Sequence, residues 1–120
     1  MEIDRAYLVI ALALAVIGMV LGLYMGIVSD LQLRQVHSTF MLPGFVTLAI
    51  YGFIYRLWPA LKKAPLAQAQ FWTASAGAAM LIVGSYFYAV SGSVPIAAIG
   101  SIVFIIAGAM LLWQFWAYAR

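Results

Sequence analysis

The chain has 120 residues, of which 68% are hydrophobic and 8% are charged, and its formal net charge is +3. Its mean hydropathy of +1.10 leaves too little polar surface for a protein that folds in water, so the composition predicts a membrane protein. The absence of cysteine excludes disulfides, thiolate-bound metals, iron–sulfur clusters and covalently attached c-type heme. The six Lys and Arg residues lie scattered near the ends of apolar runs, which argues against a nucleic-acid partner.

Four apolar runs have the length of a membrane-spanning helix: residues 6–28, 36–58, 70–90 and 94–118. The first follows the mixed-charge MEIDR and has no obvious small-residue cleavage site, so we expect a retained span rather than a signal peptide. The segments between the runs are short, which favours antiparallel packing of consecutive helices. The sequence therefore predicts an all-α, polytopic membrane protein in which residues 1–120 form a single four-helix transmembrane domain, an antiparallel bundle.

The basic residues predict an orientation in the membrane. Five of the six fall on one side of the expected bundle: Arg5, Arg56, Lys62, Lys63 and Arg120. Only Arg34 lies on the other side. By the positive-inside rule both termini are cytoplasmic and Arg34 faces outward. We expect a multi-pass protein of the inner (plasma) membrane of a bacterium, surrounded by membrane lipid.

The only histidine, His37, lies in RQVHST at the start of the second run. Ionisable residues inside spans are uncommon and are functional candidates. In a helix, Arg34 lies one turn before His37 on the same side, so a heme ligated by the imidazole would direct its propionates toward Arg34. Gly44 shares this face and would leave room for a flat ring. Equally open is a structural role, in which His37 donates a hydrogen bond to a carbonyl or faces headgroups.

The RQVHST stretch, followed by a glycine-bearing apolar helix, resembles the second transmembrane helix of subunit I in the heme–copper oxidases. The C-type oxidases and nitric oxide reductases are most similar. In them an R-x-x-H-[ST] pattern carries an axial ligand of the low-spin heme, so the resemblance implies that His37 binds heme b. The resemblance covers residues 6–59. The later GFVTLAIYGFIYRLWP resembles small four-span proteins described as subunit I-like, with Thr39 standing where the second histidine of an HxH motif is expected.

The family's remaining histidines are missing from this chain. A complete oxidase or nitric oxide reductase active site is therefore excluded, and whether the chain takes part in an enzyme stays open. In a symmetric homodimer, two copies of His37 would hold one heme between them, a closed centre suited to electron transfer.

Alternatively, each chain binds its own heme, with Met41 or an open position as the sixth site. Met41 is one turn after His37 on the same helix and cannot reach the opposite face of the same heme. An intrachain ligand would then come from another methionine: Met19, Met25, Met80 or Met110.

Three function classes follow. The first is a homo-oligomeric b-type heme protein for electron transfer or a respiratory accessory role, with a respiratory redox partner or a quinone. Tyr51 and Tyr55 are the residues that would border a quinone, although aromatic packing explains them as well. The second is a cofactor-free structural or assembly subunit of a respiratory oxidase complex, docking through glycines that recur along one face of each helix, such as Gly18, Gly22 and Gly26. The third, a transporter of the small multidrug resistance type, is disfavoured because residues 6–28 lack the glutamate on which that type depends.

Overall fold

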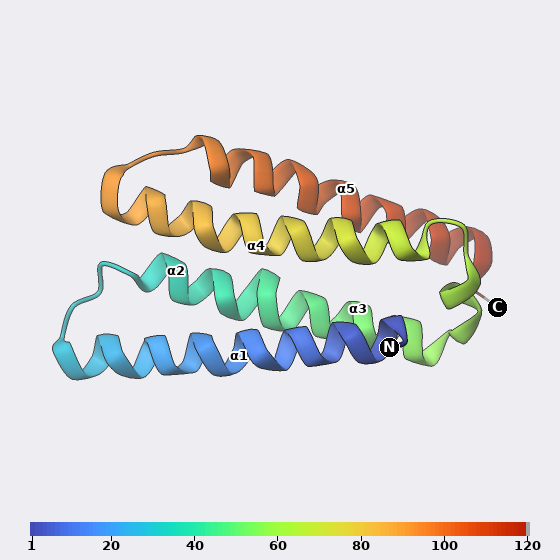
Figure 1. Ribbon diagram of the computed structural model, residues 1–120, viewed down its shortest axis with the longest axis horizontal. Coiled ribbons are helices and arrows are strands. Elements are labelled where there is room, and N and C mark those ends of the chain that lie inside the picture. Colours follow the sequence, from blue (N-terminus) through green and yellow to red (C-terminus); the bar gives the residue numbers. More distant parts are fainter. Residues whose placement is uncertain (120) are drawn as a thin grey trace.

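The computed structural model of the chain describes residues 1–119, and these fold into a bundle of helices (Figure 1). In chain order the elements are α1 (Ile3–Val28), α2 (Arg34–Thr39), the π-helix η1 (Phe40–Thr47), α3 (Leu48–Leu57), the 3-10 helix η2 (Pro59–Lys63), α4 (Ala67–Ser91) and α5 (Pro95–Tyr118). Because α2, η1 and α3 are continuous, they make one span, Arg34–Leu57. The predicted all-α bundle of four helices long and apolar enough to cross a membrane is confirmed.

The turns between the spans divide the bundle into two ends. Both described chain ends lie at one end together with η2, which we call the termini end (Figure 1). The opposite end, here the distal end, carries the turns at residues 29–33 and 92–94. Two of the turn residues, Ser29 and Gly92, have left-handed backbone conformations that stop α1 and α4, and Pro95 begins α5.

The helices pack as two close pairs, α1 with the η1–α3 span and α4 with α5, and the pairs meet where α2 lies along α4. Glycines allow the backbones of α4 and α5 to approach each other. A Cβ on Gly77 would lie 2.9 Å from Cα of Phe104, and one on Gly84 would overlap the backbone of Ala97. Small residues at these positions are typical of membrane helix contacts, where lipid provides no hydrophobic driving force for association.

The second span is irregular in its middle. Pro43 lies inside the π-helix η1, where it has no N–H to donate to the preceding turn. In the same segment, the hydroxyl of Thr47 donates to the carbonyl of Leu42 at 3.0 Å. A proline in a span is expected to bend the helix, and the wider π turns accommodate it here.

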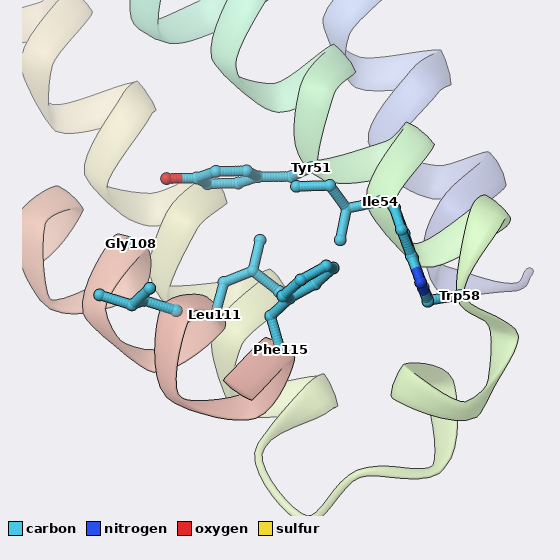
Figure 2. A pocket seen from close by; sticks show the side chains of 7 residues that line it. Tyr51, Ile54, Trp58, Gly108, Leu111 and Phe115 are labelled. Carbon is cyan, nitrogen blue, oxygen red and sulfur yellow. The ribbon is translucent and has the colours of Figure 1, made fainter. Parts of the chain in front are cut away.

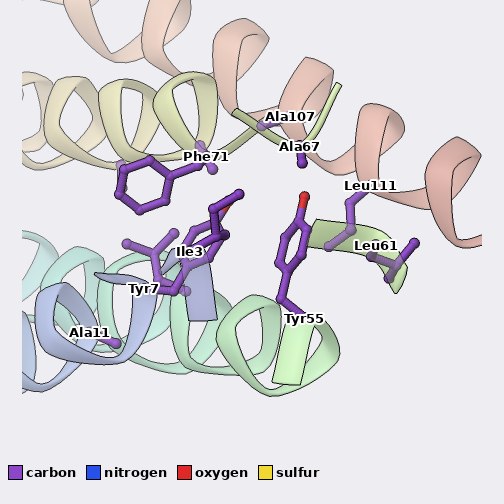
Figure 3. Close-up of a cluster of buried hydrophobic side chains, with 12 residues drawn as sticks. Ile3, Tyr7, Ala11, Tyr55, Leu61, Ala67, Phe71, Ala107 and Leu111 are labelled. Atoms are coloured by element: carbon purple, nitrogen blue, oxygen red, sulfur yellow. The ribbon is translucent and has the colours of Figure 1, made fainter. Parts of the chain in front are cut away.

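The largest group of buried side chains lies toward the termini end (Figure 3). Its large members include Tyr7, Tyr55, Leu61 and Leu111, and small residues such as Ala107 complete it. The outer surface is the opposite of a soluble protein's, because many large apolar side chains are exposed: Leu12, Leu23, Ile105, Leu112 and Trp116 among others. Such a surface matches the hydrocarbon of a bilayer.

Candidate functional site

His37 lies between α2 and α1, with its ring against two glycines of α1. Its Nδ1 is 2.7 Å from the carbonyl oxygen of Gly18. A carbonyl only accepts hydrogen bonds, so Nδ1 carries a proton, and in this tautomer Nε2 has a lone pair. A Cβ on Gly22 would lie 2.8 Å from Cε1 of His37, so this glycine is what lets the ring approach α1.

The second ring nitrogen has no protein partner. No residue within 1–119 donates a hydrogen bond to Nε2 of His37, and Nε2 is not among the fully buried unpaired polar atoms of that range. His37 as a whole is half-buried, next to the exposed Ser38. The geometry therefore leaves Nε2 as an accessible acceptor or ligand atom on a ring that Gly18 holds in place.

The other predicted site residues lie on or near the same helix contact. Met41 packs on α1, with its Sδ 2.6 Å from the position of a Cβ on Gly18. Gly44 is buried against α1 as well, where a Cβ would meet Leu14 at 3.1 Å. The space predicted for a flat ring beside Gly44 is thus filled by Leu14, and helix packing accounts for this glycine.

Arg34 is the first residue of α2 and is exposed at the distal end, one turn from His37. No ion pair joins it to a carboxylate of the described residues. Thr39 faces a different neighbour than His37 does: it is buried and lines a pocket toward α4 and α5. The residues of RQVHST therefore divide between two faces of α2. His37 lies against the glycines of α1, as do Phe40 and Met41 at the start of η1.

The donor set for a metal is small. Within the described chain, no group of three or more His, Cys, Asp or Glu side chains is placed to hold a metal ion. His37 offers one nitrogen ligand, and Met41 packs against Gly18, one turn of α1 from the Gly22 that the His37 ring contacts.

A second cluster of polar residues, absent from the sequence interpretation apart from Tyr55, ties all four spans together near the termini end. Tyr7, Tyr55, Gln70 and Gln114 are each 0% exposed. The hydroxyls of Tyr7 and Tyr55 both donate to Oε1 of Gln70, at 2.5 and 3.1 Å, and Nε2 of Gln70 donates to the carbonyl of Ala107 at 3.1 Å. Nε2 of Gln114 reaches the hydroxyl of Tyr55 at 3.4 Å. Figure 3 shows Tyr55 extending from α3 toward α5.

Charged residues close the termini end just beyond this network. Arg56 pairs with Asp4 at 3.1 Å, and Lys62 pairs with Glu2 at 2.9 Å and with Asp4 at 3.2 Å. The hydrogen bond from Lys62 to Glu2 raises the pKa of Lys62 above its ordinary value, with further support from Asp4. These pairs fasten α3 and η2 to the start of α1.

An apolar groove of about 390 Å³ runs between α3 and α5. Its lining residues are Tyr51, Ile54, Trp58, Gly108, Leu111, Leu112 and Phe115. Figure 2 shows Tyr51 at its edge with the hydroxyl directed toward α5, where a Cβ on Gly108 would lie 3.2 Å away. Among residues 1–119 the Tyr51 hydroxyl has no hydrogen-bond partner, unlike that of Tyr55. The sequence suggested that both tyrosines border one site. In the structure, the Tyr55 hydroxyl bonds to Gln70, whereas Tyr51 lines the groove.

Comparisons with protein-family models, with curated protein sequences and with solved structures find no match to this chain. We therefore infer function from the geometry of His37 and its surroundings.

Proposed function

We propose that this chain is a membrane-embedded b-type heme protein that uses His37 as an axial ligand in a homo-oligomer, with an electron-transfer or respiratory accessory role. The observation that carries the proposal is the 2.7 Å contact between Nδ1 of His37 and the Gly18 carbonyl. Histidines that bind metals commonly donate their other ring N–H to a carbonyl, which fixes the ring and its tautomer. That arrangement presents Nε2 to an iron.

The surroundings of His37 fit an axial ligand but not a heme crevice within one chain. Met41 and Leu14 fill the space at Gly18 and Gly44, so a heme would lie at the edge of the α1–α2 contact and not inside the bundle. One chain offers one histidine, and a two-fold axis would bring a second His37 to the same heme. The exposed Arg34 would neutralise the propionates. Bound in this way, heme would supply one-electron transfer.

The orientation and redox partners belong to the same proposal. Four of the five described Lys and Arg residues lie at the termini end, which supports cytoplasmic termini in a bacterial inner membrane: Arg5, Arg56, Lys62 and Lys63. A quinone partner is supported by the groove at Tyr51, whose free hydroxyl would donate to a quinone oxygen.

The test separates ligation from helix packing by comparing His37→Gln with His37→Ala. The glutamine amide keeps an N–H donor for the Gly18 carbonyl but removes the imidazole nitrogen. After expression with ample heme and purification in detergent, dithionite-reduced minus oxidised spectra should show sharp heme bands in the wild type and none in either variant. Retention of the bands in His37→Gln, at wild-type heme content, would remove His37 from the site.

A second candidate is a cofactor-free structural or assembly subunit of a respiratory complex. It is favoured by the same contact, because a histidine hydrogen-bonded to α1 and seated on Gly22 also serves to fasten two helices. Under that function the wild type is colourless, and His37→Gln retains more stability than His37→Ala because it retains the donor.

A further inference from the structure

A polar pocket of about 420 Å³ opens among α2, α4 and α5, on the side of α2 away from the α1 glycines. Its lining residues are Gln35, Thr39, Leu81, Ser85, Tyr88, Ala97 and Ser101. Five of these seven carry a hydroxyl or an amide. The lining is therefore unusual for a chain that is 68% hydrophobic, and it contrasts with the apolar groove at Tyr51.

The three aliphatic hydroxyls of this pocket lie at a common depth. Thr39 is five residues from the distal end of its span, and Ser85 and Ser101 are each six residues from the distal ends of theirs. At 1.5 Å per residue these positions are about 8 to 9 Å inside the helix ends. Gln35, Tyr88 and Ala97 lie closer to the distal end, so they form the mouth and the hydroxyls form the floor.

The floor can accept hydrogen bonds but has no proton left to donate. Thr39 donates to the carbonyl of Gln35 at 2.8 Å, Ser85 to Ile82 at 2.8 Å and Ser101 to Ala97 at 2.9 Å. Each hydroxyl has only one proton, so each oxygen keeps only its lone pairs for a guest. A molecule that reaches the floor must therefore bring the donors.

The absence of charged lining residues indicates that the bound molecule is neutral. None of the seven lining residues is charged, and an ion inside a span without a counter-ion is strongly disfavoured. We propose that this pocket binds a small neutral molecule that donates several hydrogen bonds, an alcohol or polyol, entering from the distal end. The volume falls within the range of small-molecule sites. The proposal does not depend on heme, because His37 points to α1.

The absence of cysteine makes thiol labelling a clean test. Ser85→Cys places a thiol on the pocket floor, and Val83→Cys places one on an exposed apolar position of the same helix, facing lipid. Ser93→Cys, in the exposed distal turn, gives the intrinsic reactivity of each reagent. The reagents are three methanethiosulfonates of similar size: neutral 2-hydroxyethyl, cationic trimethylammonioethyl and anionic sulfonatoethyl. Glycerol is the competing polyol.

We expect Ser85→Cys to react faster than Val83→Cys, because a thiolate forms only where polar groups or water reach it. Relative to Ser93→Cys, the preference for the neutral reagent over both charged ones should be on the order of tenfold. Glycerol should slow labelling of Ser85→Cys and leave Ser93→Cys unchanged. If Ser85→Cys does not fold, Ser101→Cys carries the same test from α5.

Three results would each overturn the proposal. Labelling of Ser85→Cys no faster than that of Val83→Cys would mean that the pocket is closed or lipid-filled. Equal rates with neutral and charged reagents would mean that it does not select against charge. Labelling that glycerol does not slow would exclude a polyol as the guest.

Discussion

At the termini end, Gln70 forms hydrogen bonds with groups on three other helices, whereas at the distal end Thr39 donates only to the carbonyl of Gln35 in its own helix. The difference is repeated in the neighbouring residues, since Tyr7 and Tyr55 bond across the bundle while Ser85 does not. Hydrogen bonds thus join the spans at the termini end. At the distal end, single hydrogen bonds from His37 to Gly18 and from Gln32 to Ala89 accompany close backbone contacts, and other acceptors stay free.

Flexibility and ligand binding are expected at the distal end. Polar groups that satisfy one another across helices leave nothing for a guest and make a rigid end. Hydroxyls bonded within their own helix leave lone pairs free, and His37 leaves Nε2 free. Nε2 of His37 and the polar hydroxyls therefore belong to the half of the bundle where no polar network joins all four spans, whereas the apolar groove at Tyr51 lies at the termini end.

The largest effect is expected where the backbones of α4 and α5 are in close contact in the distal half. A methyl group at Gly84 would overlap the backbone of Ala97, so Gly84→Ala should lower the free energy of unfolding by about 3 kcal/mol through overpacking. Gly26→Ala is the matched control, because no other atom lies within 4 Å of its Cβ position. Equilibrium unfolding in mixed detergent and SDS measures both variants; equal stabilities would show that α4 and α5 are not in this close contact.

A smaller loss is expected from the centre of the polar network. Gln70→Leu leaves the hydroxyls of Tyr7 and Tyr55 buried without their acceptor, and should cost about 2 kcal/mol. Gln114→Leu should be nearly neutral, because it removes one bond of 3.4 Å together with an amide oxygen that has no partner in residues 1–119. The same unfolding assay ranks the pair. A greater loss for Gln114→Leu would contradict the role given to Gln70.

The ion pairs at the termini end should produce a weak pH dependence. Because the folded-state pKa of Lys62 lies above its ordinary value of 10.5, its stabilisation is complete below that value and is lost as the pH rises through the folded pKa. The pairs are partly exposed, so the change should stay below about 1 kcal/mol. Unfolding measured from pH 8 to 12 should show the decline in the wild type, and Lys62→Met should flatten it.

The smallest effect is expected at Tyr51. Its hydroxyl bonds to no other part of the described chain, so Tyr51→Phe should change the free energy of unfolding by less than about 0.5 kcal/mol. Tyr55→Phe, which removes a buried bond to Gln70, is the comparison and should be clearly less stable. Similar losses for both tyrosines would mean that the Tyr51 hydroxyl has a partner in the protein.

Hydropathy alone predicted the spans well, since all four helices end within one residue of the apolar runs and begin within three. The polar network was harder to see because Gln70 and Gln114 look like ordinary interfacial residues near the ends of their runs. A signal was present: Tyr7, Tyr55, Gln70 and Gln114 each lie two to four residues from the termini end of their spans. In an antiparallel bundle equal depth predicts proximity.

The sequence could not predict which side chains of α1 lie against Gly44 and His37. Gly44 and His37 share one side of a helix by spacing, as the sequence indicated, but which neighbouring side chain fills that side depends on the register of α1. In the structure Leu14 lies beside Gly44 and Gly22 lies beside His37. To predict space for a cofactor, it is therefore necessary to know which side chain of the neighbouring helix packs against the glycine. The heme, the redox partner and the oligomeric state stay predictions.

The most direct test of the central proposal is the heme content of the purified wild-type protein, expressed with ample heme and measured against chain concentration. The proposal predicts a Soret band, a low-spin six-coordinate spectrum and about one heme for two chains, because each copy supplies one His37. A wild type without a Soret band would contradict heme binding altogether and favour the cofactor-free subunit. One heme per chain would contradict a heme shared between two copies.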